Sequence, residues 1–123
     1  MAIVNLTQSD FEQTVAEGTV LVDYWAEWCG PCRQFGPVFE AASDKHPDIT
    51  FAKVDTDAEQ GIAAAFQITS IPTLMAFRDG VLVFSQPGAL PAPGLEKVIE
   101  AVNALDMDDV RRQIAEKQTA QES

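Results

Sequence analysis

Two short apolar runs, separated by a segment with helical spacing, limit the folds that this chain can adopt. Residues 19–26 (TVLVDYWA) and 49–55 (ITFAKVD) are rich in β-branched and aromatic residues. Such runs predict strands that are buried on both faces of a sheet. Between them, the residues from Gly30 to Pro47 carry apolar side chains at helical spacing. This strand–helix–strand order predicts a parallel sheet with helices packed on both of its faces.

Shorter patterns complete the expected order of elements. The other elements are expected as a short edge strand at 3–6, a helix capped by Thr7 or Ser9, a short helix at 58–66, two strands within 73–86 that turn at Asp79-Gly80, and an amphipathic helix at 95–105. Together they predict an α/β fold with a central mixed sheet of four to five strands, flanked by helices on both faces.

Length and composition predict one domain followed by a short extension. A chain of 123 residues suits a single core, and we place that domain at residues 1–105. In residues 106–123, the spacing of Met107, Val110 and Ile114 predicts a short helix, and the polar end is expected to be frayed. The formal net charge of −11 disfavours nucleic acid and anionic membranes as partners.

The sequence carries no pattern for export or for membrane insertion. Its first residues lack a basic region followed by an apolar core, and no run of about 20 apolar residues occurs. A cytoplasmic location is therefore expected. Because the cytoplasm is reducing, a cysteine pair there is expected to form a transient disulfide and not a persistent structural disulfide.

The two cysteines, Cys29 and Cys32, lie between the strand at 19–26 and the helix that follows it. Cys29 is expected at the helix N-terminus, where unpaired N–H groups and the helix dipole stabilise a thiolate and lower the thiol pKa. It is also expected to be the more exposed sulfur, with Cys32 deeper and less solvated. This arrangement predicts a nucleophilic thiol at Cys29 and a resolving thiol at Cys32.

A zinc site is a competing interpretation of two closely spaced cysteines. Structural zinc needs about four ligands. The single histidine, His46, falls about 25 Å from Cys29 along the predicted helix at 1.5 Å per residue. No metal site is therefore expected, although a metal shared between two chains and a pair of buried unreactive cysteines stay open as minor alternatives. No bound cofactor is expected either, because the chain lacks a glycine-rich dinucleotide loop.

The segment VDYWAEWCGPC (22–32), followed by ITSIPTLMAF (68–77), RDG (78–80) and GAL (88–90), resembles the thioredoxin family. The resemblance extends over about residues 3–105 and implies the thioredoxin fold. It also implies a protein-disulfide reductase that acts in cell redox homeostasis. The Gly-Pro pair between the cysteines is similar to that of reducing members. Further implications are regeneration by a flavin-dependent thioredoxin reductase that uses NADPH, oxidised client proteins as substrates, and a monomeric state.

Asp23 matches the family's buried aspartate, which implies that it takes the proton of Cys32 when that thiol must attack. A lone carboxyl in an apolar strand is expected to have a raised pKa, because burial disfavours the anion. Lys53 resembles the family lysine near this aspartate and would lower the same pKa. The sequence leaves the balance open. An Asp23 that faces solvent from an edge strand is an alternative.

Pro72 resembles the family's cis-proline, which faces the dithiol. It leaves the backbone of Ile71 free to pair with an extended client segment. Trp28 is expected to be partly exposed beside Cys29, whereas Trp25 suits core packing. The predicted client-binding surface is a flat apolar patch that binds proteins weakly and broadly. Its members are Trp28, Gly30, Pro31, Ile71, Pro72, Gly88 and Ala89.

Two functions of other classes could use the same surface. The chain could be a redox-independent binding module, such as a stability or processivity subunit. It could also be a redox-sensing regulator whose oxidised form releases a dedicated partner. Retention of biological activity without the cysteines would favour the first of these, and failure to turn over a simple protein disulfide would favour the second.

Overall fold

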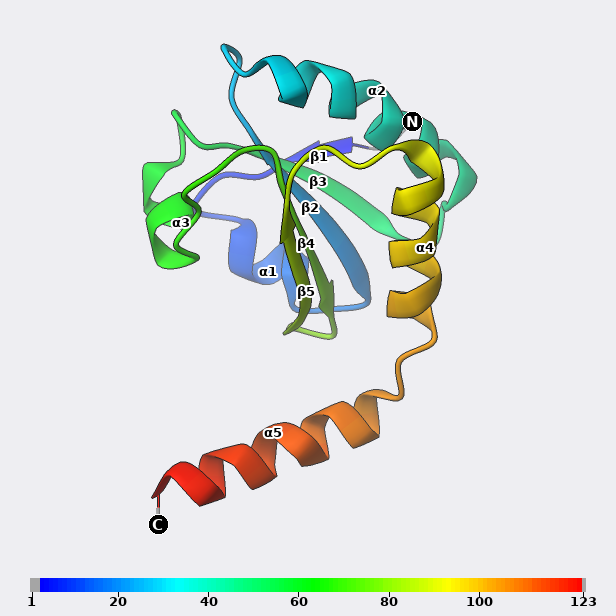
Figure 1. The fold of residues 1–123 in the computed structure, drawn as a ribbon. Helices are drawn as coiled ribbons and strands as arrows, with labels where there is room; N and C mark the ends of the chain where they lie inside the picture. The colour runs from blue at the N-terminus through cyan, green and yellow to red at the C-terminus, as the bar shows by residue number, and fades with distance from the viewer. Residues whose placement is uncertain (1–2, 123) are drawn as a thin grey trace.

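The computed structural model describes residues 3–122, which form one five-stranded sheet with helices on both faces (Figure 1). The strands are β1 (Ile3–Asn5), β2 (Thr19–Trp25), β3 (Thr50–Asp55), β4 (Thr73–Arg78) and β5 (Val81–Pro87). The helices are α1 (Phe11–Val15), α2 (Gly30–Lys45), α3 (Gln60–Ala65), α4 (Ala92–Asn103) and α5 (Met107–Glu122). Residues 1 and 2 of the predicted domain, and Ser123 of the extension, lie outside the described residues.

The sheet has the strand order β1-β3-β2-β4-β5. β3 pairs in parallel with both β1 and β2, whereas β4 pairs antiparallel with β2 and β5. The predicted mixed α/β sheet is therefore confirmed. β2 occupies the centre, and Asp23 on this strand pairs in register with Lys53 of β3.

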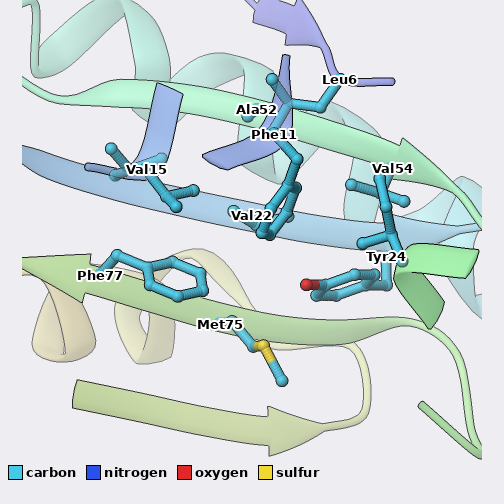
Figure 2. Packing of buried hydrophobic residues seen from close by; sticks show 11 residues of the cluster. Leu6, Phe11, Val15, Val22, Tyr24, Ala52, Val54, Met75 and Phe77 are labelled. Atoms are coloured by element: carbon cyan, nitrogen blue, oxygen red, sulfur yellow. The ribbon is translucent and has the colours of Figure 1, made fainter. Parts of the chain in front are cut away.

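Alternate side chains of β2 enter two separate cores, one on each face of the sheet. Val20, Val22 and Tyr24 pack with α1 and α3, whereas Leu21 packs with α2 and α4. Figure 2 shows the first core, in which Val22 and Tyr24 lie among side chains of α1, β3 and β4. Burial on both faces explains why the 19–26 run is almost wholly apolar.

Local backbone chemistry sets the ends of two elements. Asp79 and Gly80 both have positive φ, +51° and +86°, as the two-residue turn between β4 and β5 requires. This turn was predicted. α4 begins at Ala92, before the expected start at Leu95. A proline in the first turn is compatible with this earlier start, because the N–H that proline lacks would have no hydrogen-bond partner within the helix.

The C-terminal extension is a single helix that reaches Glu122, which is longer than the short helix and frayed end expected from the sequence. The Asp106 carboxylate accepts hydrogen bonds from the backbone N–H groups of Asp108 and Asp109 and so caps the helix start. Asp109 then pairs with Arg112 one turn later, which supports a polar helix. The domain division at residue 105 stays a prediction.

α5 meets the domain close to the β4–β5 turn. Met107 is buried, and the Arg111 guanidinium lies 3.5 Å from the Asp79 carboxylate at that turn. Within the described residues, no helix combines the length and the apolar character that crossing a membrane requires.

Replacement of Leu95 by alanine tests the core formed by α2 and α4. Leu95 is 0% exposed, so we expect L95A to lower the free energy of unfolding by about 2–5 kcal/mol. Leu82, which is 41% exposed, is the matched control, and L82A should cost less than about 1 kcal/mol. Urea denaturation measures both values. Equal losses in the two variants would contradict the assigned core.

Candidate redox site

The cysteine pair lies where the central strand passes into a helix. β2 ends at Trp25, and α2 begins at Gly30 with Cys29 as its N-cap residue (Figure 1). Cys29 and Cys32 form a disulfide, and their Cα atoms are 5.3 Å apart. Residues three apart at a helix start lie close enough for this bond. The start of α2 therefore holds the two cysteines close enough to form this disulfide.

The two cysteines differ in their hydrogen bonding, although as whole residues they are equally buried. The Cys32 N–H donates to Cys29 Sγ at 3.2 Å, so this sulfur accepts a bond from the first turn of α2. Each cysteine is 4% exposed. At the level of whole residues, the greater exposure expected of Cys29 is therefore not found. The reason is that Ala26 and Ile71 pack against the pair, and the Ile71 carbonyl oxygen lies 3.7 Å from Cys29 Sγ.

Asp23 is fully buried in the central strand. The alternative that it faces solvent from an edge strand is wrong, because β2 lies between β3 and β4. Among the described residues, neither of its carboxylate oxygens has a hydrogen-bond partner. Burial raises the pKa of Asp23 to about 7, and the charge of Lys53 lowers it to a smaller extent. Burial thus outweighs the lysine, which settles the balance that the sequence left open.

Lys53 reaches the site from the neighbouring strand β3. Its ammonium lies 4.0 Å from Asp23 Oδ2 and 4.8 Å from the centre of the Trp25 ring. A cavity of about 180 Å³ is bordered by Cys32, Lys53, Trp25 and Gly36, among other residues. This cavity provides space for water beside Cys32 on the side of the lysine.

Trp28 stands out on the surface, with 68% of its area exposed, as the sequence predicts. Its indole Nε1–H donates to Asp57 Oδ2 at 2.9 Å. Gly30 and Pro31 are exposed at the start of α2. Trp25 is half-buried. Its packing beside the cysteines agrees with the interior role expected of it.

The loop before β4 and the loop after β5 form the other side of the site. The Ile71–Pro72 peptide bond is cis, and the Gly88 N–H donates to the Pro72 carbonyl at 2.8 Å. Ile71 is half-buried, whereas Gly88 and Ala89 are exposed. Pro72 is buried, so the prediction that it forms part of the exposed apolar patch is wrong. The structure therefore brings Ile71 to Cys29 and joins Gly88 to Pro72.

Asp57, which accepts a hydrogen bond from Trp28, is a residue of the site that the sequence patterns do not indicate. It follows β3, whose carboxyl end lies beside that of β2 because the two strands are parallel neighbours. A polar residue just after the strand at 49–55 could have been placed near Trp28 on this ground.

In the described part of the chain, no group of three or more His, Cys, Asp or Glu side chains is arranged to hold a metal ion.

The raised pKa of Asp23 makes the stability of the folded chain depend on pH. Between pH 3.8 and about 7, the folded chain keeps the Asp23 proton while the unfolded chain has lost it. The stability that this proton contributes is full below pH 3.8 and is lost as the pH rises to about 7. The whole loss is about 4 kcal/mol, since one pKa unit corresponds to about 1.4 kcal/mol.

Asp23→Asn removes this titration and tests it. We expect the variant to gain stability over the parent chain as the pH rises from 4 to 8, by about 4 kcal/mol across the range. Urea denaturation of the parent chain and of Asp23→Asn, both in the disulfide form, measures the difference between their free energies of unfolding at several pH values. A difference that stays constant with pH would show that Asp23 titrates at its ordinary pKa.

Comparison with known proteins agrees with this geometry. The family model described as "Thioredoxin" matches residues 2–101. The chain is 56% identical over 116 residues to "Putative thioredoxin 2" of Streptomyces coelicolor, covering 94% of this chain and 87% of the relative. It is 44% identical over 101 residues to a thioredoxin of Staphylococcus saprophyticus, covering 81% of this chain and 97% of the relative.

A solved thioredoxin of Plasmodium falciparum superposes with a TM-score of 0.74 at 33% identity, covering 82% of this chain and 98% of that one. This likeness confirms the thioredoxin fold. The Cys29–Cys32 disulfide supplies the redox-active pair that the chemistry of such proteins requires. The chain belongs to the thioredoxin family and is a thiol–disulfide oxidoreductase.

Proposed function

We propose that Cys29 is the nucleophile of this protein-disulfide reductase and that Cys32 resolves the intermediate. The Cys29 thiolate attacks one sulfur of a client disulfide, forms a mixed disulfide and releases the other client sulfur as a thiolate. The Cys32 thiolate then attacks Cys29 Sγ. This second step forms the Cys29–Cys32 disulfide and releases the remaining client thiol, so the client gains the two electrons that the chain loses.

The observation that carries this assignment is the hydrogen bond from the Cys32 N–H to Cys29 Sγ at 3.2 Å. A donor at a helix N-terminus stabilises negative charge on the sulfur that accepts it. Cys29 is that sulfur, so it is the one better suited to react as a thiolate. The Ile71 carbonyl beside it also marks where a client backbone would run.

Asp23 is proposed as the group that accepts the proton of Cys32. Its pKa of about 7 suits a group that must take up a proton and give it away near neutral pH. Lys53, 4.0 Å from Asp23 Oδ2, is the residue that stabilises the anion after the proton has left. The cavity beside Cys32 and Lys53 supports exchange of that proton with water.

Client proteins are proposed to bind over the exposed surface around Cys29. Trp28, Gly30 and Pro31 form one side of this surface, and Gly88 and Ala89 form the other. An extended client segment would pair with the backbone of Ile71, beside Cys29 Sγ. Pro72 is buried below this position and supports the loop through its bond with Gly88.

Family membership implies a thioredoxin reductase and client proteins as general partners. For this chain we propose regeneration by a flavin-dependent reductase that draws on NADPH, a monomeric state, and a cytoplasmic location, where thiols are kept reduced. The strong negative charge of the chain favours clients and a reductase with neutral or basic contact surfaces.

Trapping of the mixed disulfide tests the assigned roles. In a Cys32→Ser variant the resolving step is absent, so we expect the chain to accumulate as a covalent adduct on Cys29 with a disulfide-bonded protein such as insulin. The matched Cys29→Ser variant keeps one thiol and should form such adducts at least about tenfold more slowly, because Cys32 lacks the N-cap position. Non-reducing gels and peptide mass spectrometry measure both. Faster adduct formation by Cys29→Ser would reverse the roles.

A double variant, Cys29→Ser with Cys32→Ser, separates reductase function from binding alone. We expect it to lose turnover of insulin disulfides and the biological activity that depends on them. Full biological activity in this variant would instead support a redox-independent binding module.

A further inference from the structure

We propose that Gly36 is a positioning residue for the resolving step, because the side chain that it lacks leaves room for water beside the Lys53 ammonium. This inference rests on the proposed role of Asp23 as the group that accepts the proton of Cys32. Gly36 has no side chain that could exchange a proton, so its effect would pass through this water and Lys53.

Gly36 lies at a position where its missing side chain faces Lys53. It is buried in the interior of α2, where glycine destabilises a helix relative to alanine, so its presence there requires a reason. It follows Cys32 by four residues, and residues four apart share one face of a helix. A Cβ at Gly36 would lie 3.9 Å from Lys53 Nζ, which is an ordinary van der Waals contact. A methyl group would therefore fit and would fill the space beside the ammonium.

The space beside Gly36 belongs to the cavity of about 180 Å³ that Lys53 also borders. Glu27 and Arg33 border the same cavity and are exposed, so it communicates with the surrounding solvent. Each water molecule occupies about 30 Å³ in the liquid, so the cavity has room for several. The ammonium carries three donors, and its 4.0 Å separation from Asp23 Oδ2 is too long for a hydrogen bond. Water in the cavity can accept hydrogen bonds from these donors.

Hydration of Lys53 affects Asp23 because the two side chains are close and oppositely charged. In register with Asp23 lie Lys53 of β3 and the apolar Leu74 of β4, while Cys32 of α2 is the titratable residue at the cavity. Water beside the ammonium solvates the ionised pair, and its displacement by a methyl group favours the neutral carboxyl. At neutral pH, Asp23 would then hold its proton more often and could not take that of Cys32.

A reaction with two phases measures the resolving step separately from the first attack. The aromatic disulfide 5,5′-dithiobis(2-nitrobenzoate) releases one coloured thiolate when Cys29 attacks it and a second when Cys32 resolves the mixed disulfide. The first phase depends on the reagent concentration, whereas the second is intramolecular and does not. At pH 7 we expect Gly36→Ala to slow the second phase about two- to fivefold and to leave the first unchanged, because a smaller fraction of Asp23 is ionised.

The matched control is Gly36→Ser, because Pro37 also favours a preceding residue without a Cβ in a helix. Alanine and serine both introduce that Cβ, so a difference between the two variants does not arise from the backbone. The serine hydroxyl can accept a hydrogen bond in place of the displaced water. We therefore expect Gly36→Ser to recover at least about half of the parent rate in the second phase. Equal slowing in the two variants would overturn the role of water.

The pH profile and a double variant test whether Gly36 acts through Asp23. The two chains should converge as the pH rises towards about 9, since Asp23 is then ionised in both. In the reduced chain, the NMR titration of the Asp23 carboxyl should move to higher pH in Gly36→Ala. In an Asp23→Asn background, Gly36→Ala should slow the second phase no further. An unchanged second phase in the single variant, equal slowing at every pH, or equal slowing in both backgrounds would overturn the inference.

Failure of this inference is distinguishable from failure of the proposed function. Reversed roles of Cys29 and Cys32 appear in the trapping experiment whichever residue stands at position 36. If Asp23 is not the proton acceptor, Asp23→Asn itself keeps the parent rate in the second phase. If only Gly36 is misassigned, Asp23→Asn slows that phase and Gly36→Ala does not.

Discussion

Burial of β2 on both faces is the constraint from which the rest of the site follows. The strand lies between β3 and β4, and its side chains enter both cores. Its carboxyl end leads directly into α2, so Cys29 meets the N-terminus of that helix. The same burial removes water from Asp23 and raises its pKa to about 7. One strand thus places the proposed nucleophile and also adjusts the acidity of the proposed base.

The position of Lys53 shows how such a site avoids too strong a stabilisation of the Asp23 anion. A close ammonium would ordinarily lower the pKa of a carboxyl. Here the distance to Asp23 Oδ2 is 4.0 Å and the lysine also lies over the Trp25 ring, so it is shared between two partners. Desolvation of Asp23 remains the larger effect. Asp23 can consequently exist in both protonation states near neutral pH, which a proton acceptor that works repeatedly requires.

Features encoded by local pattern were predictable from the sequence, and features set by distant contacts were not. The buried strands, the helical stripe after Gly30 and the Asp79-Gly80 turn each depend on residues close together in the chain, and the structure confirms them. The equal exposure of the two cysteines depends on Ile71, and the orientation of Trp28 depends on Asp57. The pKa of Asp23 required the relative size of two opposed effects, which only the three-dimensional packing supplies.

The placement of α5 has a consequence for how the molecule can be used. This helix meets the domain near the β4–β5 turn, at the end of the sheet opposite the start of α2 (Figure 1). A bulky disulfide-bonded substrate that covers the Cys29 face would therefore not collide with α5. Immobilisation of the protein through this helix, for example on a resin or an electrode, should leave the thiols open to macromolecules in the surrounding solution.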